Sequence, residues 1–331
     1  MSDVASAAGV SLVTVSRAVN TPDKVAAETL AVVRSAVARL GYVPNLTAGS
    51  LASSRSRIVA AIVPTISNQV FSETIEALTR TLAEGGYQLL LGQSAYRNRD
   101  EDALVEAFLG RRVDGLVLTG CGQSAALRTR LRRAGVPVVQ TWDLPDGDGR
   151  TAPRVLDMAV GFSNVAAGGA AARHLIERGC RALGYVGADE ERSRQRFDGY
   201  RAEIARAGLG DATADLMRPP VQIDQAAAQL AQLMARRSDL DAVFCSNDLL
   251  AAGVLFECHR LRIDVPRRLA VMGFGDLPIA RAASPQLSTV RVRRAEMGER
   301  AGQMLLARLA DKDPGARQVN IGFEVVARAS T

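Results

Sequence analysis

The chain has 331 residues, a length that suits about two folded units. Hydrophobic residues make up 47% of it and aromatic residues only 4%, which predicts a globular protein with an aliphatic core. No apolar run approaches the roughly 20 residues needed to cross a bilayer, and the first residues lack the long apolar stretch of a secretory signal. We therefore expect a cytoplasmic protein that has no membrane partner.

The net charge is +6, and half of it lies in the first 57 residues, which hold six basic and three acidic side chains. A compact basic N-terminus is typical of a segment that binds a polyanion. The charge alone does not decide this, because many solvated surfaces carry as much.

The cysteines and histidines form no pattern typical of a metal or redox site. The four cysteines, at 121, 180, 245 and 258, include no Cys-x-x-Cys pair. His174 and His259 have no partner at ligand spacing, since the adjacent helical positions 258 and 259 do not face each other. We expect buried thiols in a reducing compartment, no metal ion and no cofactor.

Residues 3–20 predict two short helices joined by a tight turn. Gly9 has the conformational freedom to close the first helix, and Ser11 can accept a backbone N–H at the start of the second. This arrangement is a helix-turn-helix. Apolar residues share one face of each helix: Val4, Ala5 and Ala8 in the first, and Val15, Ala18 and Val19 in the second.

The outward face of the second helix is short and ends in an arginine. Such a face suits the major groove of a duplex, where arginine grips guanine with two hydrogen bonds and apolar side chains contact thymine methyl groups. The face consists of Leu12, Val13, Thr14, Ser16 and Arg17.

Four apolar residues at spacings of three, four and three predict a third helix that completes the headpiece core: Leu30, Val33, Val37 and Leu40. Pro44 then fixes an extended stretch. Residues 46–52 predict about two turns of a helix that is marginal alone, because it contains Gly49 and two hydroxyl residues. Residues 53–57 have the composition of a linker.

The strings DVASAAGVSLVTVSRAVN and LGYVPNLTAGSLA resemble the DNA-binding headpiece and hinge of the lactose-repressor (LacI) family. The helix-turn-helix positions match one by one, and the Tyr-x-Pro-Asn motif and hinge leucine follow at the family's distance. The resemblance implies a homodimer on a near-palindromic operator, with Leu51 inserted into the minor groove. It assigns DNA contacts to Ser11, Leu12, Val13, Thr14, Ser16, Arg17, Asn20, Tyr42, Asn45 and Leu51.

From residue 58 onward, short apolar runs alternate with amphipathic segments of helical length, which predicts βαβ crossovers and parallel sheets. The LacI resemblance covers this region too and implies a periplasmic-binding-protein-like core with a ligand between two lobes. The predicted strands are 58–64, 87–93, 114–119, 136–142, 155–162, 182–187, 241–245, 269–274, 287–292 and 319–327. Helices are predicted at 71–84, 102–111, 165–178 and 294–309.

The expected fold is therefore an all-α helix-turn-helix headpiece followed by an α/β core of two parallel-sheet lobes. The predicted parts are a DNA-binding headpiece over 1–45, a hinge helix and linker over 46–57, and an effector-binding and dimerisation core over 58–331. Within the core, lobe 1 is predicted at 58–159 plus 290–318, and lobe 2 at 160–289 plus 319–331.

Four segments are most similar to LacI-family regulators of gluconate use: PTISNQVFSE, LDMAVGFSN, LDAVFCSNDLLAAGVLFECHRL and AVMGFGD. Gly275 stands where many relatives carry a sugar-binding aspartate, which favours an anionic sugar over a neutral one, although Asp276 can substitute. We expect a repressor that a sugar acid such as gluconate releases from DNA.

Polar side chains at strand ends are candidate effector contacts, because ligands of open α/β sheets bind there. Arg196 aligns with the family's ligand-binding arginine, and a guanidinium can bind a carboxylate through two parallel hydrogen bonds. The alternatives are a solvated helix start for the arginines and a helix cap for Asn247 or Asp248, of which we expect one to cap and the other to face the cleft. The predicted contacts are Asn68, Phe71, Arg194, Arg196, Asn247 and Asp276.

A NAD-dependent enzyme is the alternative function. The run Gly120-Cys121-Gly122-Gln123-Ser124-Ala125 follows a predicted strand and has the outline of a dinucleotide-binding turn, with Asp143 at the end of the next strand. The pattern is short and lies behind two earlier βα units, which favours a plain strand-to-helix turn. No Gly-x-Ser-x-Gly or Ser-x-x-Lys motif supports a hydrolase, so we expect no catalytic residues.

Overall fold

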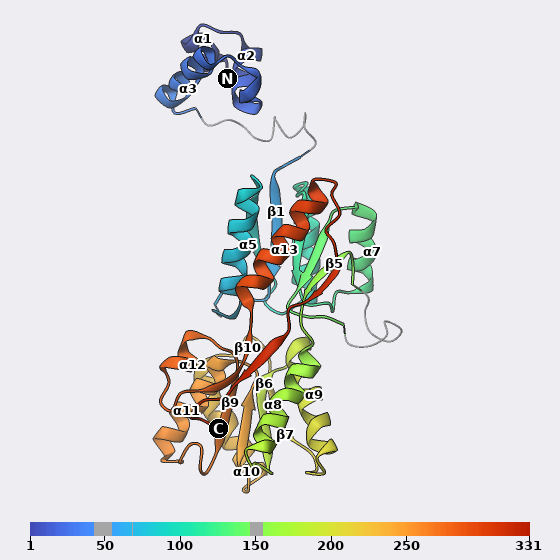
Figure 1. The fold of residues 1–331 in the computed structure, drawn as a ribbon, viewed down its shortest axis with the longest axis vertical. Helices are drawn as coiled ribbons and strands as arrows, with labels where there is room; N and C mark the ends of the chain where they lie inside the picture. The colour runs from blue at the N-terminus through green and yellow to red at the C-terminus, as the bar shows by residue number, and fades with distance from the viewer. Residues whose placement is uncertain (43–54, 68, 146–154) are drawn as a thin grey trace. The chain divides into compact units, whose positions relative to one another are not determined.

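The computed structural model describes residues 1–42, 55–67, 69–145 and 155–331. The chain divides into two compact units, Met1–Ser56 and Arg57–Thr331, which we call the headpiece and the core domain (Figure 1). None of the helices in the described ranges is long and apolar enough to cross a membrane. All four cysteines are free thiols, and all except the half-buried Cys180 are buried.

The headpiece contains α1 (Ser2–Ala8), α2 (Leu12–Asn20) and α3 (Ala27–Leu40). Gly9 ends α1 with a φ of 62°, in the left-handed region that favours glycine, as the sequence predicts. Leu40 was expected to face the core but is 47% exposed, because it lies one turn beyond Ala36, the last buried residue of α3. The small hydrophobic core of the headpiece consists of Val4, Ala5, Val15, Ala18, Val33 and Ala36.

The core domain has two lobes. The strands of lobe 1 are β1 (Ile58–Val63), β2 (Gln88–Gln93), β3 (Gly115–Thr119), β4 (Val138–Thr141), β5 (Met158–Gly161) and β11 (Gln318–Asn320). Its helices are α5 (Ser72–Glu84), α6 (Asn98–Gly110), α7 (Ala125–Ala134) and α13 (Arg294–Leu309). The strand order is β11-β5-β4-β3-β1-β2, and every pairing is parallel.

The strands of lobe 2 are β6 (Leu183–Ala188), β7 (Thr213–Met217), β8 (Ala242–Cys245), β9 (Ala270–Gly275), β10 (Ser288–Val292) and β12 (Phe323–Val326). Its helices are α8 (Asn164–Glu177), α9 (Glu191–Arg206), α10 (Ala226–Arg236), α11 (Asp248–Leu261) and α12 (Pro278–Ala282). The order is β12-β10-β9-β8-β6-β7, parallel except for the antiparallel pair of β10 and β12.

Both faces of the lobe 1 sheet are covered, which is why its strands are almost continuously apolar. Val59, Ala61 and Val63 of β1 belong to the hydrophobic cluster that includes side chains of α5 and α13. Ala60 and Ile62 point the other way, into a cluster with side chains of α6 and α7. Figure 1 shows α5 and α13 side by side on the near face of this sheet.

Within the described segments, the chain crosses between the lobes three times, after β5, β10 and β11. The last crossing corrects the prediction of a single strand at 319–327, because the chain leaves lobe 1 after β11 and enters lobe 2 at β12. Gly322 lies in this crossing with a φ of 67°, a conformation that costs glycine least. The half-buried strand β7 was not predicted, since its sequence TADLM has no strong apolar pattern.

Helices α8 and α9 cross so closely that glycines of one helix contact the backbone of the other (Figure 1). A Cβ on Gly168 would lie 1.8 Å from the carbonyl oxygen of Arg196, and a Cβ on Gly199 would lie 1.9 Å from that of Val165. This crossing therefore requires glycine at both positions and fixes the place of Arg196 relative to α8.

We expect Gly168→Ala to lower the free energy of unfolding of the core domain by about 1–3 kcal/mol, the usual cost of overpacking. Gly169→Ala is the matched control on the same helix, because its Cβ would meet nothing nearer than the Gly199 oxygen at 3.5 Å. At position 169, the better helix propensity of alanine should raise the free energy of unfolding by at most about 1 kcal/mol. Urea unfolding measures both, and equal effects would contradict the close-crossing argument.

Candidate functional site

The start of α2 is organised by a side-chain cap. The Ser11 hydroxyl accepts a hydrogen bond from the backbone N–H of Thr14 at 3.2 Å, and the two hydroxyl groups are 2.9 Å apart. The cap satisfies a donor that the first turn of a helix otherwise leaves without a partner. Thr14 is thereby held at the N-terminal end of the outward face of α2.

This face carries two of the most exposed large apolar residues of the headpiece. Leu12 is 52% exposed and Val13 is 59% exposed, while Val15 on the opposite side is fully buried. Arg17 is exposed one turn further along, and Ser16 is half-buried. Exposed apolar side chains beside an arginine are costly in water but suit the methyl groups and guanine edges of a major groove.

Of the other predicted DNA contacts, Asn20 ends α2, and Tyr42, Asn45 and Leu51 follow α3. Tyr42 is half-buried and packs against the headpiece core, so its ring also helps to close the three-helix bundle. Asn45 and Leu51 lie outside the described residues, as does the side chain of Asn20.

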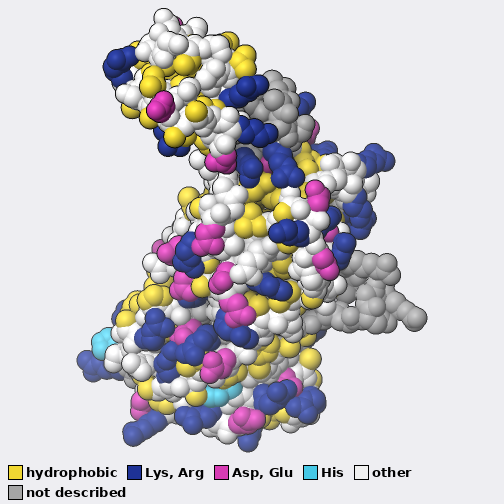
Figure 2. All heavy atoms as spheres, turned by 45° about the horizontal axis from the view of Figure 1, so that its top comes forward, with side chains coloured by type: hydrophobic (Ala, Val, Ile, Leu, Met, Phe, Trp, Pro, Cys, Tyr) yellow, Lys and Arg dark blue, Asp and Glu magenta, His cyan; other side chains and the backbone are white. Residues whose placement is uncertain are grey.

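In Figure 2 basic and acidic side chains are interspersed over the visible face of the core domain, and beyond residue 57 the numbers of basic and acidic residues nearly balance.

A hollow with a mixed polar and apolar lining lies between the two lobes of the core domain and spans about 460 Å³, a volume that includes open solvent. We call it the interlobe hollow. Three kinds of side chain line it: aromatic rings, the charged groups that follow β6, and polar groups that follow β8. The lining residues are Val70, Phe71, Tyr96, Trp142, Ala188, Glu190, Arg192, Arg196, Val221, Ser246, Asn247 and Phe274.

Arg196 is the most constrained cation of the hollow. It is 6% exposed, and its Nη1 donates to Asn164 Oδ1 at 2.6 Å, while its guanidinium carbon lies 4.3 Å from the centroid of the Phe274 ring. None of the described residues accepts a hydrogen bond from its buried Nε. A buried charged donor without an acceptor is unfavourable, so this nitrogen is suited to an anionic ligand.

A second arginine and a carboxylate complete the charged wall. Arg192 is 8% exposed, and its Nη2 lies 3.1 Å from Glu190 Oε2. Glu190 Oε1 lies 3.7 Å from Arg196 Nη2, so one carboxylate sits between two guanidinium groups. Burial raises the pKa of the nearby Tyr96 hydroxyl to about 12, which keeps this group a neutral donor at physiological pH.

Asp143 of lobe 1 connects to this wall through side-chain amides. Its carboxylate accepts hydrogen bonds from Asn164 Nδ2 at 3.1 Å and from Gln195 Nε2 at 3.2 Å. Asn164 in turn accepts from Arg196, so an unbroken chain of hydrogen bonds joins lobe 1 to the arginine. Burial raises the pKa of Asp143 to about 6, although the hydrogen bonds from Asn164 and Gln195 oppose the shift.

The structure brings together only some of the predicted ligand contacts. Phe71, Arg196 and Asn247 line the hollow, and Asn68 lies outside the described residues. Asn247 also caps α11 by accepting from Leu250 N, so one residue fills both of the roles that we had divided between Asn247 and Asp248.

Two predicted contacts and the neighbour of Asn247 lie elsewhere. Arg194 is exposed and paired with Asp189 at 2.7 Å, because it projects from the opposite side of α9. Asp276 is buried between Arg291 and Arg328, at 2.7 and 2.6 Å. Asp248 is fully buried and accepts from Leu277 N and from the Thr289 hydroxyl.

The sequence prediction did not assign a role to Glu190, Arg192, Tyr96 or Trp142. Arg192 follows the predicted strand 182–187, as Arg194 and Arg196 do, but only the latter two were selected. Glu190 lies at the start of a helix, where a negative charge is favourable. Tyr96 and Trp142 also lie at strand ends of lobe 1, but the prediction selected other residues there. Both adopt a positive φ, 60° for Tyr96 and 70° for Trp142, which is uncommon for aromatic residues.

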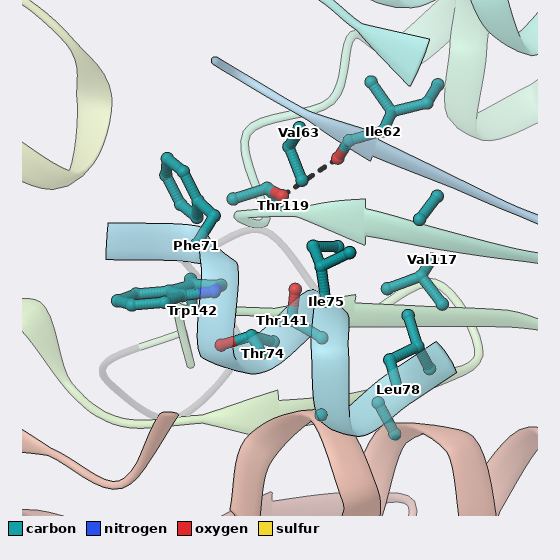
Figure 3. A pocket seen from close by; sticks show the side chains of 13 residues that line it. Ile62, Val63, Phe71, Thr74, Ile75, Leu78, Val117, Thr119, Thr141 and Trp142 are labelled. Atoms are coloured by element: carbon teal, nitrogen blue, oxygen red, sulfur yellow. Dashed lines mark hydrogen bonds between the residues drawn. The ribbon is translucent and has the colours of Figure 1, made fainter. Parts of the chain in front are cut away.

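A second hollow, beneath α5, is shown in Figure 3. Ile75 and Leu78 of α5 point toward Val117 of β3 across it, and its hydroxyl groups are engaged, as when Thr119 Oγ1 donates to the Ile62 carbonyl at 2.9 Å. Its wall bears no charged side chain among the described residues. We attribute it to packing between α5 and the sheet.

The turn that resembles a dinucleotide-binding loop is filled by the protein itself. Ser124 caps α7 by accepting from Leu127 N, so a helix start that would face a phosphate is already satisfied. A Cβ on Gly122 would lie 2.9 Å from Glu191 Oε2, which shows how closely α9 of lobe 2 covers the turn. The geometry favours a packed strand-to-helix turn over a pyrophosphate site.

The raised pKa of Asp143 predicts a specific pH dependence. The folded state holds this proton more tightly than the unfolded state does, so the stability that protonation contributes is present at low pH and is lost as pH rises through about 6. The rise from 3.8 to about 6 corresponds to about 3 kcal/mol.

Asp143→Asn removes this pH dependence, although it replaces one acceptor of the two amide hydrogen bonds by a donor. The free energy of unfolding of the variant minus that of the unsubstituted protein should therefore rise by up to about 3 kcal/mol from pH 4 to pH 7. Urea unfolding of the core domain at both pH values measures this difference. Asp198→Asn, at an exposed carboxylate of α9, is the control, and an equal change there would contradict the assignment.

Two family profiles match parts of this chain. The profile of the bacterial regulatory proteins of the lacI family matches residues 1–45, and that of the periplasmic binding protein-like domain matches residues 172–331. The HTH-type transcriptional regulator GntR of Pseudomonas aeruginosa is 38% identical over 100% of this chain and 95% of its own. The regulator IdnR of Escherichia coli is 30% identical over 98% of this chain and 96% of its own.

Solved structures agree as well. The transcription regulator GntR from Chromobacterium violaceum superimposes with a TM-score of 0.77 at 38% identity, covering 82% of this chain and 98% of that one. A LacI-family regulator from Silicibacter pomeroyi gives a TM-score of 0.89 at 30% identity, covering 99% and 98%. With a helix-turn-helix profile at its N-terminus and relatives similar along its whole length, the chain belongs to the LacI family of bacterial transcription regulators.

Proposed function

We propose that this protein is a repressor that a sugar acid such as gluconate releases from its operator. The observation that carries the effector assignment is the guanidinium of Arg196, a residue that lines the interlobe hollow and whose Nε has no acceptor in the described chain. A carboxylate supplies that acceptor. The names GntR and IdnR of the relatives agree with a sugar-acid effector, although they do not identify one.

We infer that the headpiece reads DNA as one half of a homodimer. The exposed face of α2, with Leu12, Val13 and Arg17, would enter the major groove of one half-site. A second copy related by twofold symmetry would bind the other half-site, so the operator would be a near-palindrome. Four further DNA contacts outside that face are proposed only because of the resemblance to the LacI family: Asn20, Tyr42, Asn45 and Leu51.

The effector would act through closure of the two lobes. The hydrogen-bonded chain from Asp143 through Asn164 to Arg196 bridges the two lobes. A second bridge is made by Arg294 of α13 in lobe 1, whose Nη1 donates to the Gly275 carbonyl of lobe 2 at 2.5 Å. A ligand that binds Arg196 would therefore favour the arrangement in which this chain is intact. The shift needs only a difference in effector affinity between the two arrangements.

A catalytic role is not part of the proposal. The relatives named above are transcription regulators, and the turn at Gly120 to Gly122 is packed against α9. We place the protein in the cytoplasm, where operator DNA is accessible. Addition of NADH to the purified protein should change neither the fluorescence of the nucleotide nor that of Trp142.

Arg17→Ala should weaken binding to the selected operator about 10- to 100-fold, because a bidentate arginine–guanine contact contributes about 1–3 kcal/mol. Fluorescence anisotropy with a duplex selected from a random pool measures the Kd. Arg34→Ala is the matched control, since Arg34 is an equally exposed arginine on α3. The Arg34→Ala substitution should raise the Kd for the operator by less than about threefold. Equal losses in the two variants would remove Arg17 from base recognition.

The effector assignment is tested by adding gluconate to the protein–operator complex, which should dissociate at millimolar or lower gluconate. Arg196→Ala should keep operator affinity but weaken gluconate binding at least about tenfold by calorimetry, as expected for loss of a charged hydrogen bond. Arg194→Ala on the same helix should bind gluconate normally. Undiminished binding by the first variant, with its thermal unfolding unchanged, would exclude Arg196, and a loss in the second would return Arg194 to the site.

A further inference from the structure

We propose that Glu190 sets the charge of the effector, so that the interlobe hollow accepts a sugar chain with one carboxylate and rejects one with two. The inference rests on the proposed function, because it assumes that the hollow binds sugar acids. It goes further in naming the residue that chooses among them and the class of compound that is excluded.

Glu190 is held in place by the backbone as well as by the arginines. As the N-cap of α9 it accepts hydrogen bonds from Ser193 N at 2.8 Å and from Arg192 N at 3.2 Å. The positive end of the helix dipole adds to these bonds. The carboxylate therefore cannot leave the two guanidinium groups without uncapping the helix, and it remains in the hollow when a ligand arrives.

The charge balance of the hollow follows from this anchor. Counted over the described part of the chain, its charged lining groups are Arg192, Arg196 and Glu190. Glu190 is closer to Arg192, at 3.1 Å, than to Arg196, at 3.7 Å. One positive charge is thus matched within the protein, and one, on Arg196, is left for a ligand.

Two other carboxyl groups lie near Arg192 but do not line the hollow. Asp143 is bound by the side-chain amides of Asn164 and Gln195, and Glu101 lies 3.5 Å from Gln123 Nε2. Burial raises the pKa of both carboxyl groups. They do not supply positive charge, so they offer nothing to a second ligand carboxylate.

The rest of the lining suits a polyol chain and not a second anion. Phe71 and Phe274 lie under the guanidinium groups of Arg192 and Arg196, at 5.7 and 4.3 Å from the ring centroids. Trp142 and Val221 present apolar surface, which offers a buried carboxylate no counter-charge. Asn247 contributes its amide nitrogen, which the helix cap does not use, beside Ser246 and Tyr96. Hydroxyl groups can bind to these neutral partners, whereas a dianion would face Glu190 with only one guanidinium to balance it.

The test uses three ligands with the same six-carbon polyol chain and different charge: sorbitol with none, gluconate with one carboxylate and glucarate with two. Calorimetry of the full-length protein at fixed ionic strength gives the Kd of each. The unsubstituted protein should prefer gluconate to both others. Glu190→Gln keeps an oxygen for the helix cap but removes the charge, so the ratio of the glucarate Kd to the gluconate Kd should fall by about tenfold or more.

Glu191→Gln is the matched control, because it removes the same charge one residue away from the hollow, and it should keep the ratio of the unsubstituted protein. Glu190→Asp retains both the cap and the charge and should also keep the ratio, so a fall of the ratio in Glu190→Gln alone is assigned to the lost charge. An unchanged ratio in Glu190→Gln overturns the role of Glu190 but leaves the proposed function intact. Binding of neither gluconate nor glucarate by the unsubstituted protein overturns both.

Discussion

The arrangement of the core domain depends on one chain of hydrogen bonds, from Asp143 of lobe 1 through Asn164 to Arg196 of lobe 2. Each member is buried, so each must keep its partner or leave a polar group without one. The chain joins the guanidinium of Arg196 to the other lobe. In the proposed function, binding at the hollow and the relative position of the lobes would be two aspects of one equilibrium.

The close crossing of α8 and α9 makes this coupling rigid. Gly168 of α8 lies directly against the main chain of Arg196, while the side chain of Asn164, four residues earlier on the same helix, accepts from its guanidinium. Backbone and side chain of the arginine are both fixed by one helix. A ligand therefore meets a preorganised cation, which lowers the entropy lost on binding.

Much of the fold follows from local patterns in the sequence. The three headpiece helices, the strand β1 and helices such as α8 and α13 were predicted because apolar periodicity and capping residues specify them within a few residues. The split between β11 and β12 was not predictable, since a crossing between lobes has no local signal. Strand β7 was not predicted, because it lies at the edge of the sheet and an edge strand needs few apolar residues.

The effector site was predictable only in part. Arg196 was identified through the resemblance, and Phe71 and Asn247 through their places after strands. Asp276 also follows a strand, but Arg291 and Arg328, which lie 15 and 52 residues further along the chain, neutralise it. Among the consecutive acids Asp189, Glu190 and Glu191, only the helix geometry distinguishes the one that faces the arginines. Such long-range pairings are properties of the tertiary structure.

The three passages of the chain between the lobes have a consequence for how this protein can be recombined. The headpiece is one continuous stretch, Met1–Ser56, so a single exchange of gene segments can give the core domain a new DNA preference. Neither lobe is continuous, because β11 and α13 return to lobe 1 after most of lobe 2 has been made. A single-segment exchange of one lobe would leave both sheets incomplete, so the pair of lobes is inherited and engineered as one block.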